Sequence, residues 1–238
     1  MSFTKFSPRY LCSVFGAYSK KIISPSQNAF VPGRSISDNI LLAQELFSGY
    51  NQNRLPPRCA LKVDLRKAYD TVEWDFVMAT LQLFGFPPKF IGWIKECVTS
   101  PSFYLHLNGG IHGFFTGARG LRQGDPMSPY LFVLVIEVLH MILKQFIEQE
   151  DGFAYHWQCK ELSLFQLSFA DDLILFYKAE TRSVEIFRRG LTLFASLSGL
   201  HTNPQKSDLI LSKAAAGIRT SLLETLGFQE GRLPLRYL

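Results

Sequence analysis

Two adjacent aspartates, Asp171 and Asp172, lie between two runs rich in strand-forming residues, 165–169 and 173–177. Aspartate is disfavoured inside strands, so a strand, a tight turn and a second strand would place both carboxylates at a hairpin tip. Two carboxylates held together repel each other unless a cation lies between them. Mg²⁺ prefers oxygen ligands of this kind. A plain Asp-Asp turn on a polar surface is the alternative, and these residues alone do not decide between the two.

A third aspartate, Asp64, ends a candidate strand over 59–65. Leu61, Val63 and Leu65 alternate as on the core face of a strand, so Asp64 faces the opposite side. If this strand lies beside the Asp-Asp hairpin, three carboxylates meet on one open face. Such a set would suit two metal ions about 4 Å apart and in-line phosphoryl transfer.

Composition sets broad limits on the fold and on the partners. The 238 residues are 47% hydrophobic and 19% charged, which predicts one large or two small folded domains and argues against disorder. The formal net charge of +5 is compatible with a polyanionic partner, although the signal is weak. Four scattered cysteines without a Cys-x-x-Cys pair indicate reduced thiols in a nuclear or cytoplasmic protein and disfavour a zinc site.

Neither a signal peptide nor a membrane span is expected. Basic residues interrupt the first ten positions, which removes the signal-peptide pattern. The most apolar run, 130–143, carries Glu137 and His140 and is too short to cross a bilayer. We therefore predict a buried helix there.

The periodicity along the chain predicts mixed secondary structure. Residues 1–24 show no clear periodicity. Asp70 with Glu73 resembles a capping box at a helix start, Asn108-Gly109 is a strong hairpin signal, and Ser128 is placed to cap a long helix. The predicted helices follow Ser35 or Ser37 and cover about 72–84, 88–98, 129–148, 181–198 and 218–226; the predicted strands are 59–65, the hairpins 103–111 and 165–177, and 209–211. Hairpins with few strict βαβ alternations favour an α+β domain, mostly antiparallel sheet with helices on one face.

Six segments in a fixed order resemble the motifs of one enzyme family. The chain resembles reverse transcriptases of non-LTR (LINE-type) retrotransposons, in the style common in plant genomes, from about Gln27 to Leu238. The segments are the early motif Gln27–Arg34, motif A at Lys62–Asp70, motif B at Gly120–Pro126, motif C at Phe169–Asp172, motif D from Ser198 through Asn203 to Lys206, and the start of motif E at Leu233–Leu238.

The resemblance implies a polymerase palm-type fold with a ferredoxin-like core and partial fingers. Residues 1–24 form a divergent N-terminal segment, and 25–238 form the reverse transcriptase domain, which ends within motif E. The region before Gln27 is shorter than in the family, and neither a thumb nor an endonuclease domain is recognised. We therefore expect an incomplete, retrotransposon-derived copy, truncated at both ends, with a poor grip on primer and template.

The resemblance also implies a catalytic set. Asp64 and Asp171 would ligate two Mg²⁺ ions, with Mn²⁺ as an alternative, and Asp172 would support the site. The backbone carbonyl of Leu65 would flank the triphosphate. Tyr69 would lie under the incoming sugar, where its ring would clash with a 2′-hydroxyl and select deoxynucleotides; the alternative is a core aromatic at a helix entry.

Further residues receive roles with open alternatives. Gln123 and Gly124 would line the nucleotide pocket, where glycine lets the backbone approach the substrate. Arg122 would contact template or phosphate, or be solvated. Lys206 would stabilise or protonate the pyrophosphate leaving group, or be a surface lysine. Arg34 would pair with phosphate or with a local acid. Two more acids are expected to be structural: Asp70 as a cap and Asp125 in a turn.

Three functions compete on the sequence alone. The favoured one is an RNA-directed DNA polymerase that binds an RNA template with a DNA primer and dNTPs, without a membrane partner. The second is an inactive remnant that at most binds nucleic acid. The third, a metal-dependent hydrolase, lacks additional His or Glu ligands and leaves the 122–124 loop unexplained. The sequence says nothing about oligomeric state.

Overall fold

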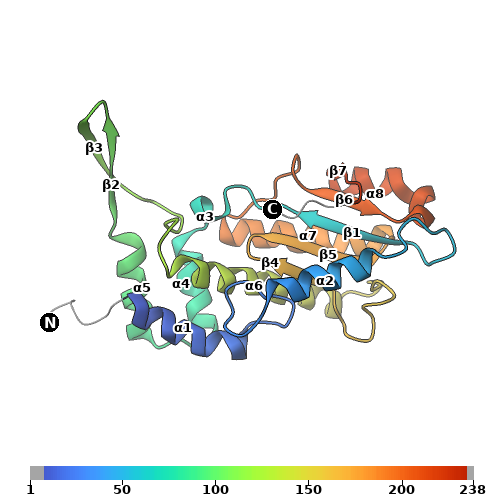
Figure 1. Ribbon diagram of the computed structural model, residues 1–238, viewed down its shortest axis with the longest axis horizontal. Helices are drawn as coiled ribbons and strands as arrows, with labels where there is room; N and C mark the ends of the chain where they lie inside the picture. The colour runs from blue at the N-terminus through green and yellow to red at the C-terminus, as the bar shows by residue number, and fades with distance from the viewer. Residues whose placement is uncertain (1–7, 235–238) are drawn as a thin grey trace.

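A five-stranded sheet forms the centre of the molecule (Figure 1). The computed structural model describes residues 8–234, so most of the predicted motif E lies outside the described residues. The strands are β1 (Arg58–Val63), β4 (Gln166–Phe169), β5 (Asp172–Lys178), β6 (Asp208–Leu211) and β7 (Gln229–Glu230), in the order β4-β5-β1-β6-β7. All neighbours are antiparallel except β6 and β7, which are parallel. The predicted α+β architecture with a mostly antiparallel sheet is confirmed.

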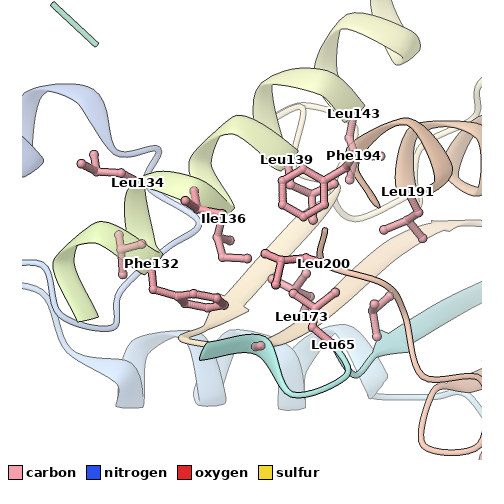
Figure 2. Packing of buried hydrophobic residues seen from close by; sticks show 14 of the residues in the cluster. Leu65, Phe132, Leu134, Ile136, Leu139, Leu143, Leu173, Leu191, Phe194 and Leu200 are labelled. Atoms are coloured by element: carbon pink, nitrogen blue, oxygen red, sulfur yellow. The ribbon is translucent and has the colours of Figure 1, made fainter. Parts of the chain in front are cut away.

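Two long helices cover one face of this sheet. The helices α6 (Ser128–Gln149) and α7 (Thr181–Ser198) share an apolar core with the alternate strand residues that face them. Figure 2 shows Leu173 of β5 on the sheet side of this core and Leu139 and Leu143 of α6 and Phe194 of α7 on the helix side. Since burying apolar area is the dominant favourable term in folding, this layer holds β1 and β5 against the two helices.

A further helix, α2 (Ile36–Phe47), is the helix predicted after Ser35 or Ser37, but it lies on the other face of the sheet, whereas the helices were expected on one face only. Its Ala43 and Leu46 pack in a second buried cluster with Ala60 of β1 and Phe176 of β5. Ala60 and Phe176 are partners across the antiparallel ladder. Helices therefore cover both faces of β1 and β5 around Ala60 and Phe176. The opposite strand ends, which carry Asp64 and Asp172, lie outside the buried cluster formed with α2.

Helix α1 (Pro8–Ile22) contradicts the expectation that the N-terminal region lacks periodicity. Leu11, Phe15, Ser19 and Ile23 are buried at four-residue intervals, which is the spacing of one helix face. Phe15 stacks among rings of the neighbouring helices. The rings are Phe90 of α5 (Pro88–Thr99), Tyr130 of α6, and Phe86 in the loop between α4 (Trp74–Leu83) and α5.

The strands β2 (Ser102–Leu107) and β3 (Gly110–Thr116) form the predicted hairpin, with Asn108 and Gly109 in the left-handed conformation that its turn needs. This ribbon projects from the body of the molecule (Figure 1). The remaining elements are the short helix α3 (Ala68–Thr71), a 3₁₀ helix (Lys213–Ile218) and α8 (Arg219–Leu226).

Two predicted helix caps are wrong. Asp70 belongs to α3, and Glu73 precedes α4 without a side-chain capping bond, so no capping box forms. Ser128 is already inside α6, which begins after Met127. By contrast, Gly199 ends α7 in the left-handed conformation that its position predicted.

Helix α6 also corrects the argument about membrane length. Its 22 residues exceed the predicted apolar run, and among the described residues 8–234 it is the one helix whose length and composition would allow it to cross a membrane. The protein itself buries 61% of its most apolar window, as expected for a core helix. All four cysteines are free, as predicted.

Candidate active site

The ladder between β1 and β5 brings the predicted carboxylates to one end of the sheet. Val63 pairs with Leu173, so the next positions outward, Asp64 and Asp172, lie opposite each other across the antiparallel strands. Phe169 pairs with Asp172 and closes the β4–β5 hairpin over a two-residue turn that contains Asp171. The predicted juxtaposition of the β1 end with the hairpin tip is confirmed.

The carboxylates influence one another electrostatically. Partial burial raises the pKa of Asp172 above its usual value; the positive charge of Lys62 opposes this shift, and the negative charges of Asp171 and Asp64 add to it. Lys62 precedes Asp64 by two residues on β1, so both side chains project to the same face. The end of the sheet therefore carries a cluster of like charges with one adjacent cation.

The loop after α7 braces the strand end at Asp64 from the side opposite β5. The Asp64 amide donates to Ser207 Oγ at 3.1 Å, and the Asn203 amide donates to the Asp64 carbonyl at 2.8 Å. Leu65, which is buried, forms an isolated bridge with Thr202. Lys206 lies in this same loop and its side chain is exposed. Motif D thus fixes the backbone on both sides of the Asp64 carboxylate.

Tyr69 lies between the helix layer and the hairpin tip. Its ring stacks on Phe132 of α6 with ring centroids 4.8 Å apart. Burial raises the pKa of the Tyr69 hydroxyl, and the negative charge of Asp171 raises it further. The Tyr69 ring is therefore half-buried against the core, which agrees with the core-aromatic alternative. It is also a neighbour of Asp171, which the sugar-gate alternative requires.

The glycine-rich loop 117–127 is docked on α3. The Leu121 amide donates to the Tyr69 carbonyl at 2.6 Å, and the Gly120 amide donates to the Val72 carbonyl at 2.8 Å. Gly120 has a φ of 90°, and a Cβ there would lie 2.8 Å from the Asp70 carbonyl oxygen. Only glycine fits this close approach. Sequence reasoning did not single out Gly120, although its place in the Gly-rich motif was a signal.

Two of the predicted pocket residues, Gln123 and Arg122, have side-chain partners, one in α3 and one within the loop. Gln123 Nε2 donates to Asp70 Oδ1 at 3.2 Å, which joins motif B to motif A. Arg122 forms an ion pair with Asp125 at 3.1 Å but stays exposed. Asp125 also accepts from the Met127 amide, which confirms its predicted role in a turn. Gly124 has a φ of 87° with open space around it, so it is required by conformation rather than by crowding.

Arg34 has structural partners. Its guanidinium donates to the backbone carbonyls of Ser24, Gln27 and Ile23 at 2.5, 2.7 and 2.8 Å. The local acid is Glu137: burial raises the pKa of that carboxyl, and the charge of Arg34 is among the influences that lower it. The described contacts thus hold the 23–27 turn together, and a phosphate contact from Arg34 stays a prediction.

The turn before the early motif is attached to the β4–β5 hairpin, in part through α2. Asn39 is buried, and its Nδ2 donates to the carbonyls of Ser26 and Ser168 at 2.8 and 3.0 Å. The Ser168 amide in turn donates to the Ser26 carbonyl at 3.0 Å. Because Ser168 belongs to β4, these bonds fix the hairpin that carries Asp171.

The donor chemistry of the three carboxylates fits a hard divalent cation, since like charges gathered at one end of a sheet are relieved by one. Within the described residues, however, no group of three or more histidine, cysteine, aspartate or glutamate side chains is arranged so that it could hold a metal ion. The backbones of Asp64 and Asp172 nevertheless lie opposite each other across β1 and β5.

Residues 9–238 match the profile of the family described as reverse transcriptase (RNA-dependent DNA polymerase). The chain belongs to this family. The match covers nearly the whole chain and includes α1, which the sequence motifs had not reached. RNA-directed DNA polymerases of this family generally use divalent metal ions.

Relatives of this reverse transcriptase chain come from non-LTR retrotransposons. It is 33% identical over 125 residues to the transposon TX1 uncharacterized 149 kDa protein of Xenopus laevis, which covers 52% of the chain and 10% of that protein. It is 28% identical over 208 residues to the Pol polyprotein of the R2DM element of Drosophila melanogaster. The aligned part covers 87% of this chain and 19% of that polyprotein. The chain therefore spans a small part of these relatives. A plant relative is an uncharacterized mitochondrial protein of Arabidopsis thaliana, 53% identical over 49 residues, which cover 20% of the chain and 40% of that protein.

The fold is that of a solved reverse transcriptase. The apo telomerase of Candida tropicalis superposes with a TM-score of 0.61 and 14% identity over 87% of this chain and 40% of that chain. The likeness at this identity concerns the fold, and it places the sheet and helices described above in the polymerase palm-type class.

Proposed function

We propose that this chain carries the catalytic centre of an RNA-directed DNA polymerase, which transfers a deoxynucleotide onto the 3′-hydroxyl of a primer. The observation that carries the proposal is the register of β1 and β5, which sets Asp64 opposite Asp172 with Asp171 at the adjacent hairpin tip. The loop 117–127 is docked on α3, whose Tyr69 is a neighbour of Asp171.

Asp64 and Asp171 would hold two Mg²⁺ ions, and Asp172 would support them. Bound divalent cations supply charge neutralisation at the triphosphate and activation of the attacking hydroxyl. The protein's own contribution is to hold the carboxylates at a fixed backbone position. The bonds from Ser207 and Asn203 do this for Asp64, and the hairpin turn does it for Asp171.

Three groups would position the incoming nucleotide. The Leu65 carbonyl follows Asp64 directly and would flank the triphosphate. Tyr69, stacked on Phe132, would present a rigid ring to the sugar. Its steric role predicts that Tyr69→Ala raises ribonucleotide incorporation relative to deoxynucleotide incorporation, whereas Tyr69→Phe does not, as measured in single-nucleotide extension.

Gln123 and Gly124 would form the wall of the nucleotide pocket, with Gln123 held by Asp70. Arg122 would contact the template or a phosphate with its exposed guanidinium. Lys206 lies in the loop that braces Asp64 and would stabilise or protonate the pyrophosphate leaving group. A Lys206→Ala variant is then expected to incorporate nucleotides more slowly while it binds template–primer normally.

An RNA template with a DNA primer is the proposed nucleic-acid partner. Family membership supports it, and a solved telomerase with the same fold is in complex with a fragment of telomeric RNA. The formal charge of +5 is also compatible with a polyanion.

The test is Mg²⁺-dependent incorporation of one complementary dNTP on an RNA template. We expect wild type and Asp151→Asn, which removes an exposed acid elsewhere, to extend the primer, and Asp171→Asn to give background incorporation. Equal extension by Asp171→Asn would refute the proposed role of the carboxylate. RNA binding without incorporation by wild type would instead indicate a non-catalytic nucleic-acid-binding remnant.

A further inference from the structure

A cavity of about 420 Å³ lies beside the loop 117–127. Its walls come from α3 and the start of α4, the C-terminal end of α5, the base of β2 and the loop itself. This volume is in the range of small-ligand pockets, about 300–1,000 Å³. Asp70, Arg122 and Gln123, which have roles in the proposed function, line part of this space, whereas its other side chains have none there.

Two aromatic rings form the apolar part of the cavity. Trp74 and Phe103 both lie close to Gly117, where a Cβ would meet the two rings at 3.3 and 3.5 Å. Trp74 is fixed because its Nε1 donates to the Gly120 carbonyl at 2.7 Å. The glycine therefore leaves room beside two ring surfaces, one of which is held rigidly.

The polar part of the cavity carries exposed cations and hydrogen-bonding groups. Arg119 and Arg122 line it with side chains that are 54% and 57% exposed, although each has an acid partner, Glu73 at 3.4 Å and Asp125 at 3.1 Å. Exposed ion pairs of this kind are weak, typically about 0–1 kcal/mol, so a phosphate can replace the acid. Aromatic surfaces beside arginines are the combination that binds single-stranded nucleic acid.

The position of the cavity identifies its ligand. Arg122 and Gln123 line it, and the same loop forms the wall of the proposed nucleotide pocket. We propose that the cavity receives an unpaired base of the RNA template, one position ahead of the base that pairs with the incoming nucleotide, with the base against Phe103 and Trp74 and its phosphate near Arg119. This inference rests on the proposed function, since it assumes an RNA template at the carboxylate site.

Cys97 reports directly on occupancy, because it lines the cavity and its side chain is exposed. Cys12 lines a separate cavity beside α1 and serves as the control thiol, while Cys59 and Cys159 are buried. We would measure iodoacetamide modification of each cysteine by mass spectrometry. Burial and nearby acids raise the pKa of the Cys97 thiol, so the reaction is run at alkaline pH.

We expect an RNA template with a single-stranded 5′ overhang, annealed to a DNA primer, to slow modification of Cys97 severalfold relative to a blunt duplex of equal length. Modification of Cys12 should be the same with both ligands. Equal Cys97 rates with overhang and blunt duplex, in a protein that still incorporates dNTPs, would overturn the cavity assignment alone. Absence of template-dependent incorporation and of protection together would overturn the proposed function and this inference with it.

A pair of phenylalanine variants gives an independent measurement. Phe103→Ala removes a ring from the cavity wall, whereas Phe114→Ala removes an 80% exposed ring from the same hairpin outside the cavity. Loss of one stacked base corresponds to about 1–3 kcal/mol, so we expect Phe103→Ala to weaken overhang binding on the order of tenfold. Phe114→Ala should match wild type. Equal weakening by both variants would contradict the assignment.

Discussion

Gly120 and Gly124 have nearly the same left-handed backbone conformation, with φ values of 90° and 87°, but different surroundings. A Cβ on Gly120 would lie 2.8 Å from the Asp70 carbonyl oxygen, whereas a Cβ on Gly124 would meet no atom within 4 Å. The first glycine is required by both conformation and contact, and the second by conformation alone. Two substitutions at one motif can therefore separate these two costs.

We predict that Gly120→Ala lowers the free energy of unfolding more than Gly124→Ala. Both variants bear the cost of a left-handed alanine, about 1–2 kcal/mol, and Gly120→Ala adds displacement of the loop from α3, on the order of 1–3 kcal/mol. Urea denaturation of the two variants beside wild type measures the difference. Equal losses would show that the loop is not held closely against α3.

At the scale of single residues, the sequence predicted which carboxylates lie together better than it predicted the residues that support them. Asp64 and Asp171 were identifiable because acids are unusual at strand ends in apolar runs. The partners of Arg34 were not, because an arginine that donates to three backbone carbonyls has no sequence signature. Asp70 was expected to cap a helix, but its carboxylate accepts from Gln123, 53 residues away.

The β4–β5 hairpin depends on α2 for its position. The side-chain amide of Asn39 on α2 donates both to the Ser26 carbonyl and to the Ser168 carbonyl of β4. Its Oδ1 accepts from Asn28 at 2.8 Å. Removal of the side chain would take one donor from each of these carbonyls, although that of Ser26 keeps the Ser168 amide, and it would leave the Asn28 side-chain amide without its acceptor. An unsatisfied buried group costs about 1–3 kcal/mol.

We therefore expect Asn39→Ala to lower the free energy of unfolding by about 1–3 kcal/mol and to increase amide hydrogen exchange in β4. The matched control is Gln44→Ala, an exposed polar residue on the same helix, which should leave both unchanged. If exchange in β4 is the same in Asn39→Ala as in wild type, α2 does not hold the hairpin.

Local signals predicted the elements whose cause is local. Asn108-Gly109 and Gly199 have the backbone conformations that their sequence context requires. Helix α1 was missed because its buried face alternates with basic and small residues, so its four-residue spacing is clear only once Phe15 is seen against α5 and α6. The docking of the 117–127 loop on α3 depends on contacts between distant segments, which no local pattern encodes.

Two histidines couple the stability of the whole molecule to pH. Burial lowers the pKa of His140 to about 4 and that of His156 to about 4, below the ordinary value of 6.5. A nearby positive charge adds to each shift, from Lys144 and Arg58 respectively. Below the ordinary value the unfolded chain binds protons that the folded chain does not, so folding loses stability as the pH falls.

We predict that the free energy of unfolding decreases between pH 6.5 and about 4 and that His156→Gln makes this decrease smaller. Urea denaturation over that pH range measures the free energy of unfolding. Wild type and variant are compared at each pH, because carboxylates titrate in both proteins over the same range. The exposed His201 provides the control: His201→Gln should keep the wild-type pH dependence. An unchanged slope in His156→Gln would contradict the assignment.

At the scale of the whole molecule, we propose that Asp64, at the end of β1, and Asp171, at the tip of the β4–β5 hairpin, act as one catalytic unit. Groups that act as a unit show non-additive losses, since removing either already disables the set. Asp64→Asn and Asp171→Asn, singly and combined, test this in single-turnover incorporation of a complementary dNTP on an RNA template with Mg²⁺. We predict that each single variant falls to background and that the double variant falls no further. Wild-type incorporation by Asp64→Asn, or by Asp171→Asn, would contradict the account.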